Sequence, residues 1–540
     1  MMRIAARPDV LSTNGGASAP SAYHAPRVVR RIVGLAVLLL IPMLGFGSAF
    51  ASAARPAAKS GGTLNIVGVG QTWASTDPIY KSAIQSAAEP YNLTYQTLFN
   101  YNTTTGKIDP LLALSFAYNA SHSTLTIQLR HNVLFQDGTP FNAQAAVFNL
   151  DRTSAASSGS PCVPFFTNVT SIQAVGTYEV KISFNPLYSA LPDVLASNPC
   201  TYMASPTAVS SEGANFPFQP VGTSSYKFVS ENLGISMTYT RFTKAWEKAH
   251  VNTVVFTNLG DDNSAIEAVQ ANTAQVYDTS GPQDIALAKA AGLKVASSPP
   301  TSEGYVRLNM TAPPFNNVVA REAFAAAING PLIVKTLFGK AAIPDQSMLT
   351  PTSWAFAGEK VHGFPQYNPS RAAALVASLP GGKLSFTLIG GNTPIQQQFI
   401  AALGSELTAI PGISMSLSPQ TSTVLLSDQH NLTYQALYAL GNGSLPDPDN
   451  NYYRALYSTS TNNQEGYVNS TFDNLIIEAR ETFSQAQRKS LYLKAELLLA
   501  TGLPIIPVYA YPISWIYNKH VHNFPALDTG NGELSGVTVT

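Results

Sequence analysis

Residues 121–152 read SHSTLTIQLRHNVLFQDGTPFNAQAAVFNLDR. Apolar and polar residues alternate over 125–129, which is the period-two pattern of a strand with one buried face. The sequence Asp-Gly-Thr-Pro at 137–140 predicts a turn. Asn142 follows, and its side chain can accept backbone N–H groups at the start of a helix with apolar residues at 147, 148 and 150. This strand–turn–helix order predicts an α/β protein.

The composition excludes one class of partner. The chain has 540 residues, of which 45% are hydrophobic and only 11% are charged, against roughly 25% charged residues in a typical soluble domain. We interpret this as a surface suited to acidic surroundings, where carboxylates are protonated. The formal net charge is zero and no basic run occurs, so we expect no nucleic-acid partner. The length predicts more than one hydrophobic core and hence more than one lobe.

The N-terminal segment has the features of an export signal. Arginines precede an apolar run at 32–50, and small residues of the A-x-A type follow it. We predict a signal peptide over 1–53 and a linker over 54–61. Pro42 and two glycines interrupt the apolar run, which favours cleavage, and a retained anchor is the alternative because about 19 residues can just cross a bilayer. No cysteine lies near the cleavage site, so we expect a protein that is extracytoplasmic but not a lipoprotein.

The chain contains two cysteines, Cys162 and Cys200. An exported chain meets an oxidising compartment, so an even count predicts one disulfide, which would stabilise the fold by about 3–4 kcal/mol in the chain-entropy description. Two unpaired buried thiols are the alternative. The cysteines have no neighbouring histidine pattern, and we expect no metal site.

Several blocks of the sequence resemble one protein family. The stretch at 121–152 is similar to the signature of family 5 extracytoplasmic solute-binding proteins, the dipeptide-, oligopeptide- and nickel-binding receptors of ABC importers. Further blocks with the same resemblance are PVGTSSY at 220–226, PPFNNVVAREA at 313–323 and YNPSRA at 367–372. The resemblance covers about 62–525. It departs from the family pattern at Ser224, where a second glycine is usual.

The resemblance implies a two-lobed α/β fold of the periplasmic-binding-protein type II, in the large peptide-receptor subclass. Lobe I would comprise 61–308 and 504–540, with an extra subdomain over about 100–215, and lobe II would comprise 309–503. The chain would cross between the lobes twice, which makes a natural hinge because few backbone torsions need to change for closure.

Residues 441–453, GNGSLPDPDNNYY, form the richest polar cluster. Glycine and proline predict a loop, and a polar surface turn is the alternative to a binding loop. The DPDN core resembles the pocket loop of the receptor family, which implies that Asp447 lies near the ligand. Peptide-binding members carry an Asp for the ligand's amine where this chain has Ser444, and an Arg for its carboxylate near 390–398, where this chain has none. A zwitterionic dipeptide would therefore lack both partners unless residues elsewhere supply them.

The remaining polar and aromatic residues suit an uncharged or peptide-like solute. We predict ligand contacts from Asn392, Asn442 and Ser444, in addition to Asp447. We expect four aromatic residues opposite them, with core packing as the alternative for each: Trp73, Tyr80, Tyr305 and Trp354.

No catalytic motif is present: neither G-x-S-x-G, H-E-x-x-H nor a P-loop occurs. His520 and His522 are interpreted as part of a solvated tail. We therefore expect no catalytic residue, metal or cofactor, and a monomer that carries a peptide or other polar small molecule to an ABC permease in the cytoplasmic membrane. The alternatives are a receptor for a neutral solute such as an oligosaccharide, a membrane-tethered sensor, and an extracytoplasmic hydrolase using Asp447 and Asp449.

Overall fold

The computed structural model describes residues 61–69, 76–80, 90–102, 105–279, 281–356, 358, 363–441, 447–525 and 534–540. The predicted signal peptide and all of the predicted linker except residue 61 lie outside these residues. Among the helices that the structure describes, none has both the length and the apolar character needed to cross a bilayer.

The stretch that opens the sequence analysis folds as predicted. Strand β5 (Thr124–Leu129) buries Leu125, Ile127 and Leu129 on one face. Helix α2 (Ala143–Ser154) starts at Asn142, whose Oδ1 accepts the backbone N–H of Ala145 at 3.0 Å. These contacts are local in sequence, and the pattern therefore sufficed to predict them.

A four-stranded antiparallel sheet forms the extra subdomain, in the order β4–β5–β7–β6. Its remaining strands are β4 (Ala113–Tyr118), β6 (Val169–Val175) and β7 (Glu179–Phe184). Helix α2 packs on β6 and β7, and α3 (Leu191–Ser197) packs on the hairpin of β2 (Phe99–Asn102) and β3 (Lys107–Pro110). The predicted disulfide is present: Cys162 and Cys200 are bonded and buried in the core of this subdomain.

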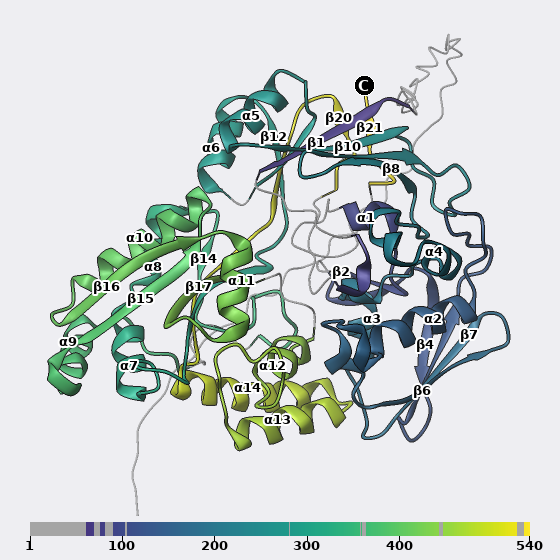
Figure 1. Cartoon of the computed structure of the whole chain (residues 1–540). Coiled ribbons are helices and arrows are strands. Elements are labelled where there is room, and N and C mark those ends of the chain that lie inside the picture. Colours follow the sequence, from purple (N-terminus) through teal and green to yellow (C-terminus); the bar gives the residue numbers. More distant parts are fainter. Residues whose placement is uncertain are drawn as a thin grey trace, which may run out of the picture. The chain divides into compact units, whose positions relative to one another are not determined.

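A seven-stranded mixed sheet follows, with the short helices α1 (Pro90–Thr94) and α4 (Pro206–Glu212) lying between it and the subdomain sheet (Figure 1). Its strands in spatial order are β12 (Lys294–Ser297), β19 (Ser514–Tyr517), β11 (Val276–Thr279), β1 (Thr63–Val69), β10 (Thr253–Leu259), β9 (Ser236–Arg241) and β8 (Tyr226–Asn232). Strand β1 is parallel to both β10 and β11, and α5 (Asp262–Gln270) connects those two. The helix α6 (Pro282–Ala290) then leads to β12. A small pair, β20 (Val521–His522) with β21 (Thr538–Val539), completes this part.

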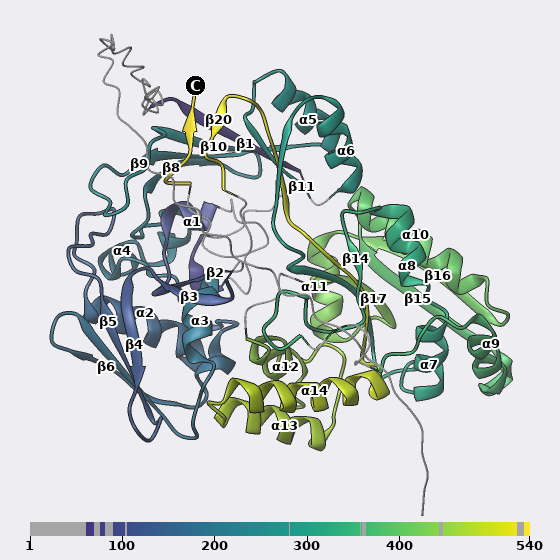
Figure 2. The same ribbon diagram turned by 180° about the vertical axis from the view of Figure 1, so that it is seen from behind.

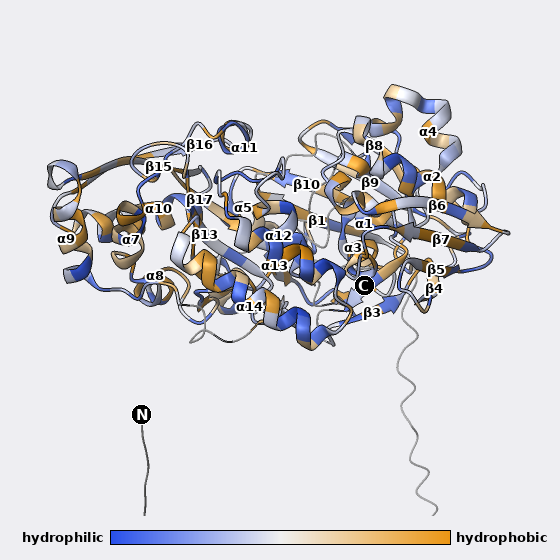
Figure 3. Cartoon of the chain, turned by 90° about the horizontal axis from the view of Figure 1, so that it is seen from below, coloured by the Kyte–Doolittle hydropathy of each residue, from blue (hydrophilic) through white to orange (hydrophobic). Residues whose placement is uncertain are grey.

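A six-stranded sheet forms the second half. Its strands in spatial order are β14 (Ile343–Pro344), β18 (Ile505–Tyr511), β13 (Ser302–Leu308), β17 (Ala436–Gly441), β15 (Leu384–Gly391) and β16 (Ile413–Gln420). The helices of this half are α7 (Val318–Ala326), α8 (Gly330–Leu337), α9 (Pro369–Ser378), α10 (Pro394–Thr408), α11 (Ser422–Asn431), α12 (Asp449–Leu456), α13 (Ser470–Glu481) and α14 (Gln485–Gly502). The largest hydrophobic core of the described residues lies here. Seen from below, α13 and α14 carry both hydrophobic and hydrophilic residues (Figure 3).

The chain changes sheets at positions other than those predicted. We placed the crossings at 308/309 and 503/504, yet β13 and β18 both belong to the six-stranded sheet. The chain therefore leaves the seven-stranded sheet after β12 and returns to it at β19. Strand β13 pairs with β17 and β18, which are far away in sequence. The apolar pattern within a strand does not indicate which distant strands it will pair with.

The subdomain also meets the second half of the chain directly. The backbone N–H of Ser189 donates to the carbonyl of Arg480 at 2.8 Å, and the ring of Tyr118 lies 4.7 Å from that of Phe483. Both views of the molecule show α13 and α14 beside the subdomain (Figures 1 and 2). The two halves are thus joined by this contact as well as by the two crossings.

Candidate functional site: a cavity between the two sheets

A cavity of about 720 Å³ is lined by residues from both sheets. The seven-stranded half supplies the ends of β1 and β11 and the start of α5 and α6. The six-stranded half supplies β13, β17 and β18 and parts of α10, α11 and α12. Its volume lies within the range usual for small-molecule sites.

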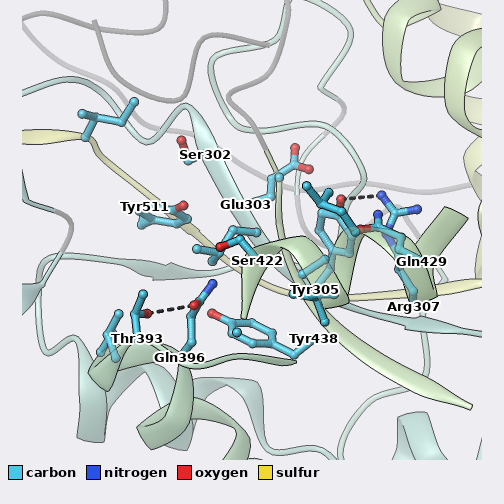
Figure 4. Close-up of a pocket in the computed structure, with 18 of the residues that line it drawn as sticks. Ser302, Glu303, Tyr305, Arg307, Thr393, Gln396, Ser422, Gln429, Tyr438 and Tyr511 are labelled. Atoms are coloured by element: carbon cyan, nitrogen blue, oxygen red, sulfur yellow. Dashed lines mark hydrogen bonds between the residues drawn. The ribbon is translucent and has the colours of Figure 1, made fainter. Parts of the chain in front are cut away.

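Strand β13 forms one wall with three charged or polar side chains. Glu303, Tyr305 and Arg307 alternate along the strand and all line the cavity. Because side chains at i, i+2 and i+4 share a face of a strand, one wall carries an acid, a phenol and a guanidinium in a row. Figure 4 shows the three side chains next to one another.

Arg307 has its counter-ion within the protein. Its guanidinium is ion-paired with the buried carboxylate of Glu465 and also donates to the Tyr305 hydroxyl at 3.0 Å. Burial alone would lower the pKa of Arg307, but the adjacent Glu465 carboxylate offsets this and the pKa is raised. The positive charge of Arg307 is therefore fixed and largely neutralised.

Glu303 and Arg454 lack such partners. Glu303 is 7% exposed, and its Oε1 is buried with no hydrogen-bond donor among the described residues. Burial, reinforced by the neighbouring acids Asp345 and Glu496, raises its pKa well above the usual range. Arg454, on α12, is half-buried and lines the cavity, and its Nε has no acceptor within the described part of the chain. Glu303 accepts a hydrogen bond from the backbone of Thr350, but neither Glu303 nor Arg454 has an oppositely charged partner among the described residues.

The opposite wall is acidic and hydroxyl-rich. Tyr277 donates its hydroxyl to Asp262 at 2.5 Å, and Thr279 donates to Asp284 at 2.7 Å. Burial raises the pKa of Asp284. These groups come from β11, α5 and α6, the strand–helix–strand segment and the helix after it, and all four line the cavity.

The third side is formed at the start of α10 and the end of β17. Thr393 donates to the side chain of Gln396 at 2.8 Å, and both line the cavity (Figure 4). Tyr438 stacks on Phe399 with ring centroids 4.1 Å apart, and this packing holds one face of the Tyr438 ring against the core. The segment at 390–398 therefore contributes an amide, at Gln396, and a hydroxyl, at Thr393, to the cavity lining.

The predicted binding residues fall into three groups. Tyr80 and Tyr305 line the cavity. Trp73, Asn442 and Ser444 lie outside the described residues. The structure does not bring the other three into the cavity: Asn392 is exposed beside it, Trp354 packs 6.1 Å from the ring of Tyr492, and Asp447 is buried elsewhere.

The two acids of the DPDN segment form ion pairs with buried arginines. Asp447 accepts a 2.6 Å bond from Arg488 on α14, and Asp449 lies 3.4 Å from Nε of the fully buried Arg480 on α13. The guanidinium of Arg480 also lies over the rings of Tyr188 and Tyr453, at 4.4 and 3.4 Å from their centroids. These contacts tie the segment to the subdomain and to the last two long helices.

Three charged residues line the cavity although they were not predicted to do so: Glu303, Arg307 and Arg454. A signal for the first two exists in the sequence, because polar residues at 303, 305 and 307 alternate with glycine, valine and leucine at 304, 306 and 308. Arg454 follows the DPDN segment closely in sequence, but the direction in which its side chain points depends on the residue at which α12 begins.

Comparison with known proteins agrees with this architecture. Residues 107–463, about two thirds of the chain, match the sequence profile of the bacterial extracellular solute-binding proteins, family 5, middle region. The chain belongs to this family. The glutathione-binding protein GsiB of Shigella flexneri is 27% identical over 507 residues, which cover 90% of this chain and 96% of that protein.

Two solved structures share the fold. The first is the periplasmic binding protein DppA of Helicobacter pylori in complex with the peptide STSA, with a TM-score of 0.80, 19% identity, and coverage of 89% of this chain and 98% of that one. The second is the dipeptide-binding protein of Pseudoalteromonas sp. SM9913 in complex with Met-Leu, with a TM-score of 0.80, 19% identity, and coverage of 89% and 100%. The predicted fold class, a two-lobed α/β binding protein with an extra subdomain, is confirmed.

Proposed function

We propose that this protein is the substrate-binding component of an ABC importer and that it captures a small peptide or a similar polar solute in the cavity. The observation that carries the proposal is that both sheets line one cavity of peptide size in a member of a solute-binding family. Relatives that bind glutathione, and proteins of the same fold with bound peptides, support a peptide-like solute.

Capture would follow from the arrangement of the two halves. Contacts from β11 and α5 on one side and from β13 and α12 on the other act on one solute together only when the halves are close. A bound solute therefore shifts the population toward the closed form. The solute would then be delivered unchanged to a permease by a monomeric protein outside the cytoplasm, exported by its signal peptide and not held by a lipid.

The hydrolase alternative has no support from the described geometry. Asp447 and Asp449 would be its two carboxylates, and each is paired with a buried arginine and lies away from the cavity. We therefore propose binding without a reaction.

A thermal-shift screen of peptides, neutral sugars and metal chelates tests the proposal. A solute at 100 times its Kd stabilises the native state by about 2.7 kcal/mol, so binders appear as a raised Tm. Ser422 lies exposed in the cavity wall on α11, and Ser427 lies exposed on the same helix outside the cavity. Ser422→Trp should abolish the shift and Ser427→Trp should keep it. Equal shifts in both variants, or no shift with any peptide, would refute capture of a peptide in this cavity.

A further inference from the structure

We infer that Arg454, on α12, binds an anionic group of the solute, and that Glu303, on β13, binds a cationic group. The solute would then be a zwitterion of about tripeptide length, not a neutral sugar. This inference rests on the proposed function and specifies the chemistry of the solute. Neither residue is at the positions from which the resemblance implied charge recognition.

Arg454 has no counter-ion among the described residues. The other cation of this wall, Arg307, is paired with Glu465, and Arg307 itself lies close enough to Arg454 to disfavour its charge. Burial first, and then Arg307, lowers the pKa of Arg454. An arginine stays protonated in proteins, so this guanidinium cannot relieve the cost by losing its proton. A carboxylate or similar anion arriving from solution would supply what the described residues do not.

Glu303 presents the complementary situation. It is nine-tenths buried, its Oε1 has no donor among the described residues, and its nearest charged neighbours, Asp345 and Glu496, are also buried acids. Glu496 already accepts bonds from Ser347 and from the backbone of Met348. The backbone of Thr350 donates to the Glu303 carboxylate, and Oε1 is the acceptor that stays without a donor among the described residues. A cation there would meet this acceptor and the neighbouring acids, which favours an ammonium group.

The spacing of the two positions sets the length of the solute. Arg307 lies four positions after Glu303 on β13, which corresponds to about 13 Å between their Cα atoms. Arg454 lies near Arg307, whose charge acts on it. The side chains reach into the cavity from both ends and shorten the gap. An extended tripeptide spans about 10 Å at about 3.3–3.6 Å per residue, which fits this gap and the 720 Å³ cavity.

The test uses three randomised tripeptide libraries: one with free termini, one amidated at the C-terminus and one acetylated at the N-terminus. The protein is mixed with each library and desalted, and the retained peptides are quantified by mass spectrometry. We expect amidation and acetylation each to lower retention by about 10- to 100-fold, the value of one charge-assisted hydrogen bond. This comparison uses the unmodified chain and does not depend on the folding of a variant.

Variants assign each loss to a residue. In Arg454→Gln, the free library should lose retention while the amidated library is unaffected, so the penalty of amidation disappears. Glu303→Gln should remove the penalty of acetylation in the same way. Arg371→Gln is the matched control, because Arg371 is exposed, pairs with Glu322 and lies outside the cavity lining.

The outcomes separate the inference from the proposed function. Retention of all three libraries to the same extent would overturn the inference and leave the peptide receptor intact. Amidation penalties that persist in Arg454→Gln would overturn the role of Arg454. If the unmodified chain retains no peptide from any library, the proposed function fails, and the inference fails with it.

Discussion

Replacing Arg480 by methionine should strongly destabilise the protein. Arg480 is fully buried, lies 3.4 Å from Asp449 and stands over the rings of Tyr188 and Tyr453. Methionine fills much of the same volume but leaves Asp449 buried with only the Tyr188 hydroxyl, at 3.3 Å, as a side-chain partner. Removing one member of a buried ion pair costs about 3–5 kcal/mol.

The measurement should be urea unfolding followed by far-UV circular dichroism. For about 480 folded residues the entropy of unfolding is about 1 kcal/mol/K, so even 4 kcal/mol moves Tm by only about 4 °C if the chain unfolds as one unit. Denaturant midpoints resolve such a change better. Arg371→Met is the matched control, because its pair with Glu322 is exposed and worth about 0–1 kcal/mol. A cost of Arg480→Met no greater than that of Arg371→Met would refute the reasoning.

The pH dependence of this variant gives an independent check. Burial raises the pKa of Asp449 to about 6 even with Arg480 present. Without Arg480 the pKa rises further, so the acid is protonated over a wider pH range. The cost of Arg480→Met should therefore shrink as the pH falls from 8 to 5, because a neutral Asp449 needs no counter-ion. A cost that is constant over this range would show that lost packing, and not lost charge pairing, determines it.

Three further predictions follow from buried groups. Asp447→Asn should lower the free energy of unfolding by about 3–5 kcal/mol, because it leaves the buried Arg488 without its counter-ion. Peptide affinity measured by titration should stay unchanged, and a loss of affinity at intact stability would contradict this prediction. Burial, and then the charge of Asp447, raises the pKa of Asp193 to about 8, so the folded state binds a proton that the unfolded chain has released, and stability should fall as pH rises from about 4 to 8. Asp193→Asn should make that slope smaller in urea unfolding at a series of pH values, while the raised pKa of Asp449 maintains part of it; an unchanged slope would exclude the assignment. Gly222→Ala should cost about 1–3 kcal/mol or more, because its Cβ would lie 2.1 Å from a backbone oxygen, whereas Gly260→Ala, with open space around it, should stay within about 1 kcal/mol by thermal melting; equal effects would refute this.

Local sequence patterns predicted much of the fold. The alternation over 125–129 and the capping residue Asn142 specify β5 and α2 through contacts a few residues apart. The PVGTSSY block is also explained by the structure, because Gly222 lies against the backbone oxygen of Thr94, which is far away in sequence. That contact is invisible in the sequence, and only the resemblance to other chains marked the glycine. The sheet crossings failed for the same reason, since pairing between distant strands decides them.

The binding site was less predictable because polar residues have two uses that look alike in sequence. The acids of the DPDN segment have the composition of a ligand loop, but Arg480 and Arg488 neutralise both of them from helices some 30–40 residues further on. Conversely, Glu303 and Arg454 gain their significance from what the described fold leaves unpaired around them. Pairing is a property of the folded chain, so the same acid can be a structural anchor or a recognition group according to whether a base reaches it.

This distinction changes how the departures at Ser444 and at 390–398 should be interpreted. A missing acid and a missing arginine in the expected segments suggested a neutral solute, on the premise that recognition must occur in those segments. The described cavity places an acid and an arginine on β13 and α12, outside the two expected segments in sequence. A charged solute needs charges of opposite sign at the right separation and is indifferent to which strand or helix carries them. The absence of charged residues at the expected positions therefore shows only that those positions do not recognise a charged group. Glu303 and Arg454, which have no oppositely charged partner among the described residues, can recognise a charged solute instead.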